Sequence, residues 1–167
     1  MKKWAKIIIL TIIIVLWMVF IFNMSAKDST QSSSISVGFT YDVLNTFFSK
    51  FRSLDKTTKD NIVESLQFIV RNGAHFVAYT ILGGLCFVDC RLLKGFNLKK
   101  NFITAFLIAV IYAIFDEIHQ YFVPGRACQF RDVMIDSCGA IFGICVVLIF
   151  YTIAKKLKNL NKIKKYG

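Results

Sequence analysis

Residues 7–22 read IIILTIIIVLWMVFIF, an apolar stretch that only Thr11 interrupts. Such a stretch predicts a membrane-spanning helix, because roughly 20 apolar residues cross about 30 Å of hydrocarbon at about 1.5 Å per residue. It is longer than the apolar core of about 7–15 residues in a secretory signal peptide, and Met24-Ser25-Ala26 is a poor cleavage site. We therefore expect an anchor that is retained in the membrane.

Three further apolar stretches follow along the chain. Residues 73–88 contain one His and no Asp, Glu, Lys or Arg, while residues 102–115 and 137–154 contain none of these five residue types. Extended to the nearest polar residues, four spans are predicted at about 6–24, 68–89, 101–120 and 133–154. The predicted fold is an all-α integral membrane protein, a single domain over residues 1–167 with four transmembrane helices.

The composition supports this fold class. The chain has 167 residues, of which 56% are hydrophobic and 19% charged, with a mean hydropathy of +0.57. Soluble domains have roughly 45–50% apolar and about 25% charged residues, so disorder is excluded and an ordinary soluble enzyme is disfavoured. The five cysteines lie mostly in apolar stretches and form no CxxC pair, which argues against structural disulfides and a zinc site.

Lysine and arginine are distributed unevenly across the predicted spans. The side with both termini and the loop near residues 90–100 carries 13 of the 21 basic residues and one acidic residue, a net charge of +12, whereas the other side carries −1. Because cytoplasmic segments are enriched in Lys and Arg, both termini are expected in the cytoplasm, with a basic tail at 155–167. The charge is thus a topology signal that also favours anionic lipid, and no nucleic-acid partner is expected.

The loop at residues 25–65 is expected on the outer side. It begins with serines and then becomes amphipathic, with apolar residues recurring at helical spacing at Phe39, Val43, Leu44, Phe47, Phe48 and Phe51. Short amphipathic helices that lie in the outer interface or cap the bundle would satisfy this pattern. A merely solvated loop would account for the serines but not for the phenylalanines.

Polar residues gather at the outer ends of spans two, three and four, where each ionisable group costs about 2.5–3.5 kcal/mol to insert. In span order they are Arg71, His75 and Tyr79, then Asp116, Glu117, His119 and Gln120, then Asp132 and Asp136. Those spaced by four residues share one face of their helix. The turn that joins the last two spans contains Pro124-Gly125-Arg126.

Helix rise predicts that two of these residues lie at the same depth. His75 is 14 residues from Asp89, and Asp116 is 14 residues from Phe102, about 21 Å in each case. Both would lie about 9 Å beneath the outer surface of a roughly 30 Å core. We expect His75 and Asp116 within hydrogen-bonding or one-water distance in an outward-opening polar cavity. The alternative is a set of separate polar residues that are satisfied by neighbours or reach the boundary.

Three motifs carry a resemblance that extends over most of the chain except about residues 39–61. They are Arg71-x-x-x-His75-Phe76-x-x-Tyr79-x-x-Leu82-Gly83, Tyr112-Ala113-x-x-Asp116-Glu117-x-x-Gln120-x-Phe122-x-Pro124-Gly125-Arg126 and Asp132-Val133-x-x-Asp136-x-x-Gly139-Ala140-x-x-Gly143. With the end of the first span near Asn23-Met24-Ser25, they resemble the VanZ-like family. The sequence departs from the family at Asn72, where Lys is common, and at Asp136, where Asn is common.

The resemblance implies a multi-pass protein of the bacterial plasma membrane and cell envelope. The family is named for low-level resistance to teicoplanin, a lipid-tailed glycopeptide directed at cell-wall precursors. A first hypothesis is that an outward-facing pocket binds membrane lipid or a lipid-linked cell-wall precursor through its anionic group. The candidate ligand-binding residues are Arg71, Tyr79, Gln120, Arg126, Asp132 and Asp136, with Arg131 as a further candidate.

A second hypothesis is an intramembrane hydrolase or transferase that acts on a lipid phosphate. His75 would be the general base or nucleophile, Asp116 and Glu117 would assist it, and Arg126 would stabilise the oxyanion. The same His75, Asp116 and Glu117, with Asp132, could hold a divalent cation, although no metal or cofactor is assigned. A third hypothesis, a small proton-coupled carrier, is disfavoured because four spans show no internal repeat.

Overall fold

The computed structural model describes residues 3–93 and 97–166, which form six helices joined by short connections. In chain order they are α1 (Lys3–Ser25), α2 (Ser29–Phe47), α3 (Ser49–Arg52), α4 (Lys56–Leu92), α5 (Leu98–Tyr121) and α6 (Phe130–Tyr166). Four of them, α1, α4, α5 and α6, are long and apolar enough to cross a membrane. The predicted all-α fold with four membrane-spanning helices is therefore confirmed.

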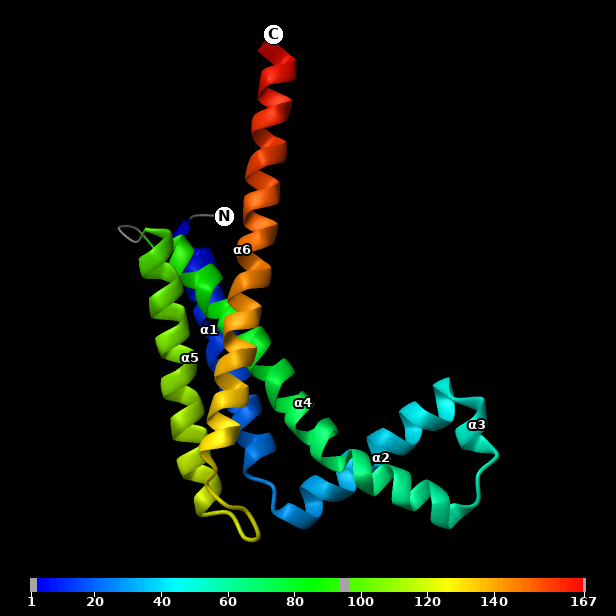
Figure 1. Ribbon diagram of the computed structural model, residues 1–167. Coiled ribbons are helices and arrows are strands. Elements are labelled where there is room, and N and C mark those ends of the chain that lie inside the picture. Colours follow the sequence, from blue (N-terminus) through cyan, green and yellow to red (C-terminus); the bar gives the residue numbers. More distant parts are fainter. Residues whose placement is uncertain (1–2, 94–96, 167) are drawn as a thin grey trace.

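The four long helices form a bundle with both chain termini at the same end (Figure 1). Helix α4 packs mainly against α6, and also against α5 and α1. We call the opposite end of the bundle, where α1 leads into α2 and α5 leads into α6, the distal end. It is the end at which the candidate polar residues lie.

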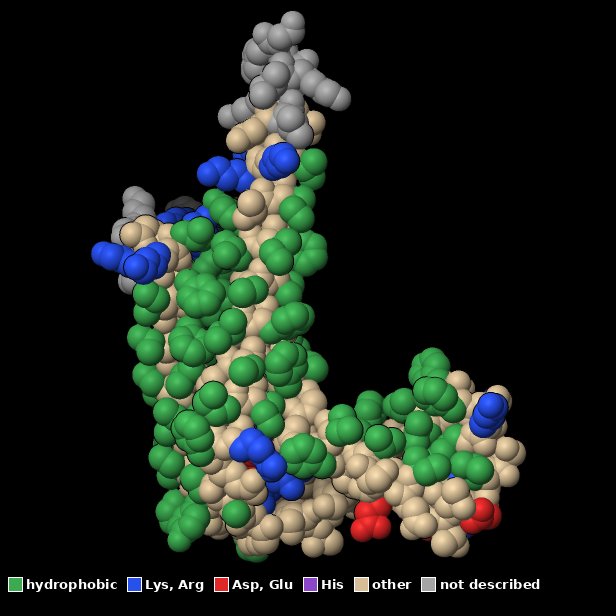
Figure 2. All heavy atoms as spheres, viewed as in Figure 1, with side chains coloured by type: hydrophobic (Ala, Val, Ile, Leu, Met, Phe, Trp, Pro, Cys, Tyr) green, Lys and Arg blue, Asp and Glu red, His purple; other side chains and the backbone are tan. Residues whose placement is uncertain are grey.

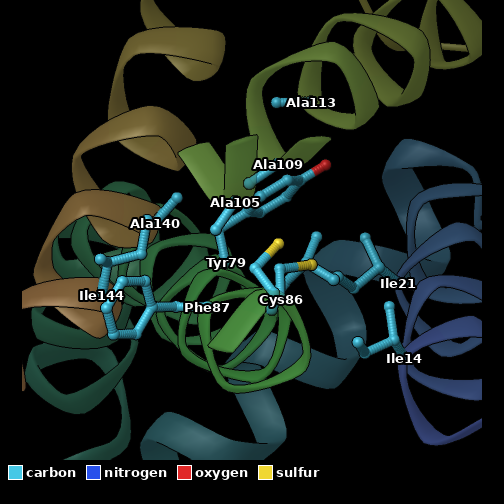
Figure 3. Close-up of a cluster of buried hydrophobic side chains, with 12 residues drawn as sticks. Ile14, Ile21, Tyr79, Cys86, Phe87, Ala105, Ala109, Ala113, Ala140 and Ile144 are labelled. Atoms are coloured by element: carbon cyan, nitrogen blue, oxygen red, sulfur yellow. The ribbon is translucent and has the colours of Figure 1, made fainter. Parts of the chain in front are cut away.

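All four spanning helices contribute to the hydrophobic core (Figure 3). Helix α5 presents the fully buried Ala105, Ala109 and Ala113, spaced four residues apart and thus on one face. These small side chains let the neighbouring helices approach closely, as is common in membrane bundles. Larger core side chains fill the space between the helices: Ile14 and Ile21 of α1, Tyr79, Leu82 and Phe87 of α4, and Ile144 of α6.

The surface of the bundle separates into an apolar belt and two polar ends (Figure 2). Hydrophobic side chains cover the belt, and basic side chains gather at the end that holds the termini. Residues 155–166, expected as a basic tail, continue α6, because no Gly or Pro follows Gly143 before the helix ends. Of the basic residues behind the charge prediction, Lys2, Lys94 and the side chains of Lys162, Lys164 and Lys165 lie outside the described residues.

Residues 25–65 form a helical arm that projects sideways from the distal end (Figure 1). We define the arm as α2, α3 and residues 56–67 of α4. The second span was expected to begin at residue 68, but its helix already begins at Lys56, after the carboxylate of Asp55 caps it by accepting from the Thr58 amide at 2.9 Å. No Gly or Pro between Lys56 and Asn72 ends the helix. The arm therefore extends away from the bundle and does not cap it.

Candidate functional site

Besides Ser25 of α1, the distal end holds four deeply buried polar side chains on α5 and α6. Asp116 is 1% exposed, and Glu117 and Gln120 of α5 and Asp136 of α6 are each 2% exposed. Burial of a carboxylate away from water is costly unless the group is hydrogen-bonded or paired. The partners of these side chains therefore define the candidate site.

A chain of hydrogen bonds joins α1, α5 and the loop at residues 122–129. The Ser25 hydroxyl donates to Asp116 Oδ2 at 2.7 Å, and the Gln120 side-chain amide donates to the same oxygen at 3.4 Å. Arg126 Nη1 donates to Gln120 Oε1 at 2.9 Å, and Arg126 Nε donates to the backbone carbonyl of Lys27 at 3.0 Å. Arg126 thus folds back over the bundle end and is held there by two neutral oxygens.

A second set of bonds fixes the start of α6. Glu117 Oε1 accepts a hydrogen bond from the Gln129 backbone amide at 2.6 Å. The Gln129 side chain in turn accepts from Arg131 at 3.0 Å, and Arg131 Nε lies 3.5 Å from Asp132 Oδ1. The Arg131 guanidinium also stacks 4.5 Å from the centre of the Phe68 ring of α4. Arg131 and Glu117 therefore both have local partners.

The carboxylate next to His75 is that of Asp136, not that of Asp116. His75 Nδ1 of α4 lies 3.7 Å from Asp136 Oδ1 of α6, and the close packing of these two helices brings the residues together. The charge of Asp116 also acts on His75, but Asp116 receives its hydrogen bonds from Ser25 and Gln120. The carboxylate that contacts His75 thus comes from Asp136, and the approach of His75 and Asp116 to hydrogen-bonding or one-water distance stays a prediction.

Two arginines at the distal end remain without a carboxylate partner. Within the described residues, neither Arg71 of α4 nor Arg126 forms an ion pair. Burial lowers the pKa of the Arg126 guanidinium below its ordinary value, and the positive charge of Arg71 lowers this pKa further. The nearby acidic residues act in the opposite direction and do not offset the shift. Arginine stays charged in proteins, so both guanidinium groups remain cations without a direct counter-ion among the described residues.

The Pro-Gly-Arg turn is shaped by its glycine and by the start of α2. Gly125 adopts a φ of +72°, in the left-handed region that other residues rarely occupy. A Cβ at Gly125 would also overlap the Ser29 side chain, and the Ser29 amide donates to the Pro124 carbonyl at 3.4 Å. The turn therefore needs glycine for two reasons. It fixes the position of the Arg126 backbone, from which the guanidinium extends.

Tyr79 of α4 is a candidate without a hydrogen bond to the others. Its side chain is fully buried in the hydrophobic core, and its hydroxyl has no hydrogen-bond partner among the described residues. Its ring lies 6.2 Å from that of Tyr112 (centroid to centroid). Among the residues that the structure describes, no three His, Cys, Asp or Glu side chains converge closely enough to hold a metal ion.

Three contributors to this end were not assigned a role from the sequence. They are the hydroxyl of Ser25, the backbone carbonyl of Lys27 and the backbone amide of Gln129. Ser25 stands in the motif that ends the first span, so its position carried a signal. The Lys27 carbonyl and the Gln129 amide are backbone groups that almost every residue type can supply, so the sequence could not identify them.

An apolar groove of about 610 Å³ lies between α5 and α6 beside the buried polar groups. Helix α5 contributes a row of side chains from Phe106 to Ile118, and α6 contributes a row from Phe130 to Ile141. Glu117 also lines the groove. Glu117 therefore belongs both to the groove and to the buried polar residues of the distal end.

Comparison with known proteins places the chain in a family. No curated protein and no solved structure matches the chain significantly. The family model described as VanZ/LLP1 matches residues 10–151. This range includes most of α1, all of α4 and α5, α6 as far as residue 151, the arm and every polar residue of the distal end. The chain belongs to the VanZ/LLP1 family.

Proposed function

We propose that the protein binds a lipid-linked anionic molecule at the distal end, with Arg71 and Arg126 holding its phosphate or carboxylate. The observation that carries this proposal is that both guanidinium groups lack an ion pair within the described residues, although several carboxylates lie nearby. Guanidinium groups bind phosphate and carboxylate through paired, charge-assisted hydrogen bonds. An incoming anion would supply the direct counter-ion that these two guanidinium groups lack.

The groove between α5 and α6 supports a lipid-linked ligand over a free anion. From Phe106 to Ile118, α5 rises about 18 Å at about 1.5 Å per residue, which is close to half of a roughly 30 Å hydrocarbon core. Its lining is apolar apart from Glu117 and Ser137. One hydrocarbon chain in the groove would bring its headgroup to the distal end.

The proposed location is the bacterial plasma membrane, with both termini in the cytoplasm. The basic residues at the terminal end of the bundle support this orientation (Figure 2). The distal end would then face the outer leaflet, where a lipid-linked cell-wall precursor is a fitting ligand. Low-level teicoplanin resistance would follow if binding changed the exposure of that precursor.

The arginines can be tested with a polyprenyl phosphate as the probe. For the protein in phosphatidylcholine nanodiscs, Arg71→Gln and Arg126→Gln should each weaken binding about tenfold or more, the loss expected for a charged hydrogen bond. Arg131→Gln is the matched control, because this guanidinium already pairs with Asp132, and it should change the affinity by less than about threefold. Equal effects of all three variants would contradict the proposal.

A lipid-phosphate hydrolase is the second candidate, favoured by the contact between His75 and Asp136. A carboxylate at Nδ1 leaves Nε2 free to take a proton from an attacking water. The water oxygen would bond to phosphorus as the bridging oxygen leaves, and Arg126 would stabilise the charge on the phosphoryl oxygens.

Phosphate release separates these two candidates. With polyprenyl diphosphate as the probe, a hydrolase should release phosphate, and His75→Ala should lower the rate by at least about a hundredfold. Asp136→Asn keeps an acceptor for Nδ1 and should retain a larger share of the rate. A wild-type protein that binds the diphosphate without releasing phosphate would exclude the hydrolase and leave the binding function.

A further inference from the structure

The arm exposes large apolar side chains on one of its sides. Ile35 is 46% exposed, Phe39 61%, Phe47 76% and Phe48 55%. Ile35, Phe39 and Phe47 recur at multiples of four residues, which forms a stripe along α2. In Figure 2 the hydrophobic side chains of the arm gather on its upper side, the side from which the bundle rises. Acidic side chains lie on its lower side.

A hollow between the two helices of the arm carries both polar and apolar groups. Ser33, Val37 and Tyr41 of α2, with Asp60, Val63, Glu64 and Gln67 of α4, line this hollow of about 490 Å³. The Tyr41 hydroxyl donates to the Asp60 carboxylate, and this bond raises the pKa of Tyr41. The arm is amphipathic because its exposed apolar stripe lies on the upper side and acidic side chains lie on the lower side (Figure 2).

The tip of the arm is basic. Lys50, Arg52 and Lys56 are exposed there, and none of them forms an ion pair in the described part of the chain. The nearby carboxylate of Asp55 is engaged with the first turn of α4 through Thr58. Three cations next to Phe47 and Phe48 thus remain available to an external anion.

The position of the arm decides what covers its apolar side. Helix α4 runs without a break from the arm into the bundle, so the arm meets the bundle where the apolar belt ends (Figures 1 and 2). The upper side of the arm therefore faces the hydrocarbon layer that would surround the apolar belt. An exposed apolar stripe of this size is unfavourable in water, whereas basic amphipathic helices lie stably in the interface of anionic bilayers.

We infer that the arm lies flat in the interfacial layer of the leaflet at the distal end. Its apolar stripe enters the boundary of the acyl chains, and Lys50, Arg52 and Lys56 bind the phosphates of anionic lipids. The tip is thus a lipid-binding site separate from the pair of arginines proposed to hold the ligand. It does not depend on the proposed function.

Depth-dependent quenching tests the position of the stripe. Phe39→Trp and Ser34→Trp place the same fluorophore on opposite sides of α2, because five residues turn a helix by about 140°. Nanodiscs of phosphatidylglycerol brominated on its acyl chains report contact with lipid, after subtraction of the wild-type signal from Trp4 and Trp17. Trp at position 39 should be quenched at least about twofold more than Trp at position 34. Equal quenching would overturn the inference.

The basic tip is tested by lipid charge. Backbone hydrogen exchange of residues 47–59 should be slower in phosphatidylglycerol nanodiscs than in phosphatidylcholine nanodiscs. The combined variant Lys50→Gln, Arg52→Gln and Lys56→Gln should abolish this difference while the exchange of α5 stays unchanged. Identical exchange in the two lipids would overturn the role of the tip. Crosslinks between two copies at Phe39→Cys, with no quenching by lipid, would assign the stripe to self-association instead.

Discussion

The Asp116 carboxylate is almost fully buried, and the two donors to it share one of its oxygens. Ser25 and Gln120 both donate to Oδ2, while Oδ1 has no partner among the described residues. Ser25 is itself 1% exposed and belongs to a different helix from Asp116. This bond therefore fastens the end of α1 to α5 at the distal end.

Loss of the Ser25 hydroxyl should lower stability. Ser25→Ala leaves a buried carboxylate short of a donor and should reduce the free energy of unfolding by about 1–3 kcal/mol. Ser137→Ala is the control, because the Ser137 hydroxyl bonds only to a carbonyl of its own helix, that of Val133. Reversible unfolding in mixed micelles measures both variants. Equal stability of the two would show that the Ser25–Asp116 bond contributes nothing.

At the same scale, the sequence predicted where the polar residues gather better than which of them pair. Helix periodicity and rise depend on local geometry, so they indicated the face and the approximate depth of His75 and Asp116. Pairing also depends on the rotation of each helix about its axis, which tertiary packing sets. This rotation turns His75 toward Asp136 of α6, and no feature of α4 alone reveals it.

Among the elements, α4 and α6 make the closest contact, and glycines allow it. A Cβ at Gly83 would lie 2.5 Å from the carbonyl oxygen of Ala140, and Cβ atoms at Gly139 and Gly143 would overlap the carbonyl oxygens of Phe76 and Thr80. The obstructing atoms belong to the backbone, which cannot move aside as a flexible side chain can. This packing holds His75 and Asp136 side by side.

Gly143→Ala should therefore separate the two helices. The overlap with Thr80 should cost about 1–3 kcal/mol of stability. Gly73→Ala is the matched control, because a Cβ there meets nothing within 4 Å, and it should be neutral or stabilise α4 by up to about 1 kcal/mol. Thermal unfolding in detergent tests this pair. A Gly143→Ala variant as stable as Gly73→Ala would contradict the described packing.

Element boundaries were predictable to different degrees. The four spans follow from the length of apolar sequence needed to cross a bilayer, and a helix over each is confirmed. The helix of the second span begins at Lys56, twelve residues before the predicted span at 68–89, because residues 56–67 are helical although they are too polar to be identified as part of a span by hydropathy. Their helical state depends on the Asp55 cap and on packing against α2.

At the scale of the whole molecule, charge and shape support the proposed orientation. Basic residues gather at the end with the termini, and the arm spreads sideways at the distal end (Figures 1 and 2). A membrane around the apolar belt would then have the basic end in the cytoplasm. The polar residues of the distal end would open toward the outer leaflet.

Cysteine accessibility tests this orientation. In a Cys128→Ser background, which removes an exposed thiol of the distal end, Ser33→Cys should react with a membrane-impermeant maleimide on intact cells. Asn161→Cys, on the exposed continuation of α6, should react only after permeabilisation. The reverse pattern would invert the topology and place the distal end in the cytoplasm.

The most direct test of the central claim, an anion held by Arg71 and Arg126, compares two ligands that differ only in the headgroup. Binding of a polyprenyl phosphate and of the uncharged polyprenol is measured on the wild-type protein in phosphatidylcholine nanodiscs. The phosphate should bind at least about tenfold more tightly, a difference of about 1.4 kcal/mol, and the preference should shrink as salt is added. Equal affinities for the phosphate and the alcohol would contradict the account.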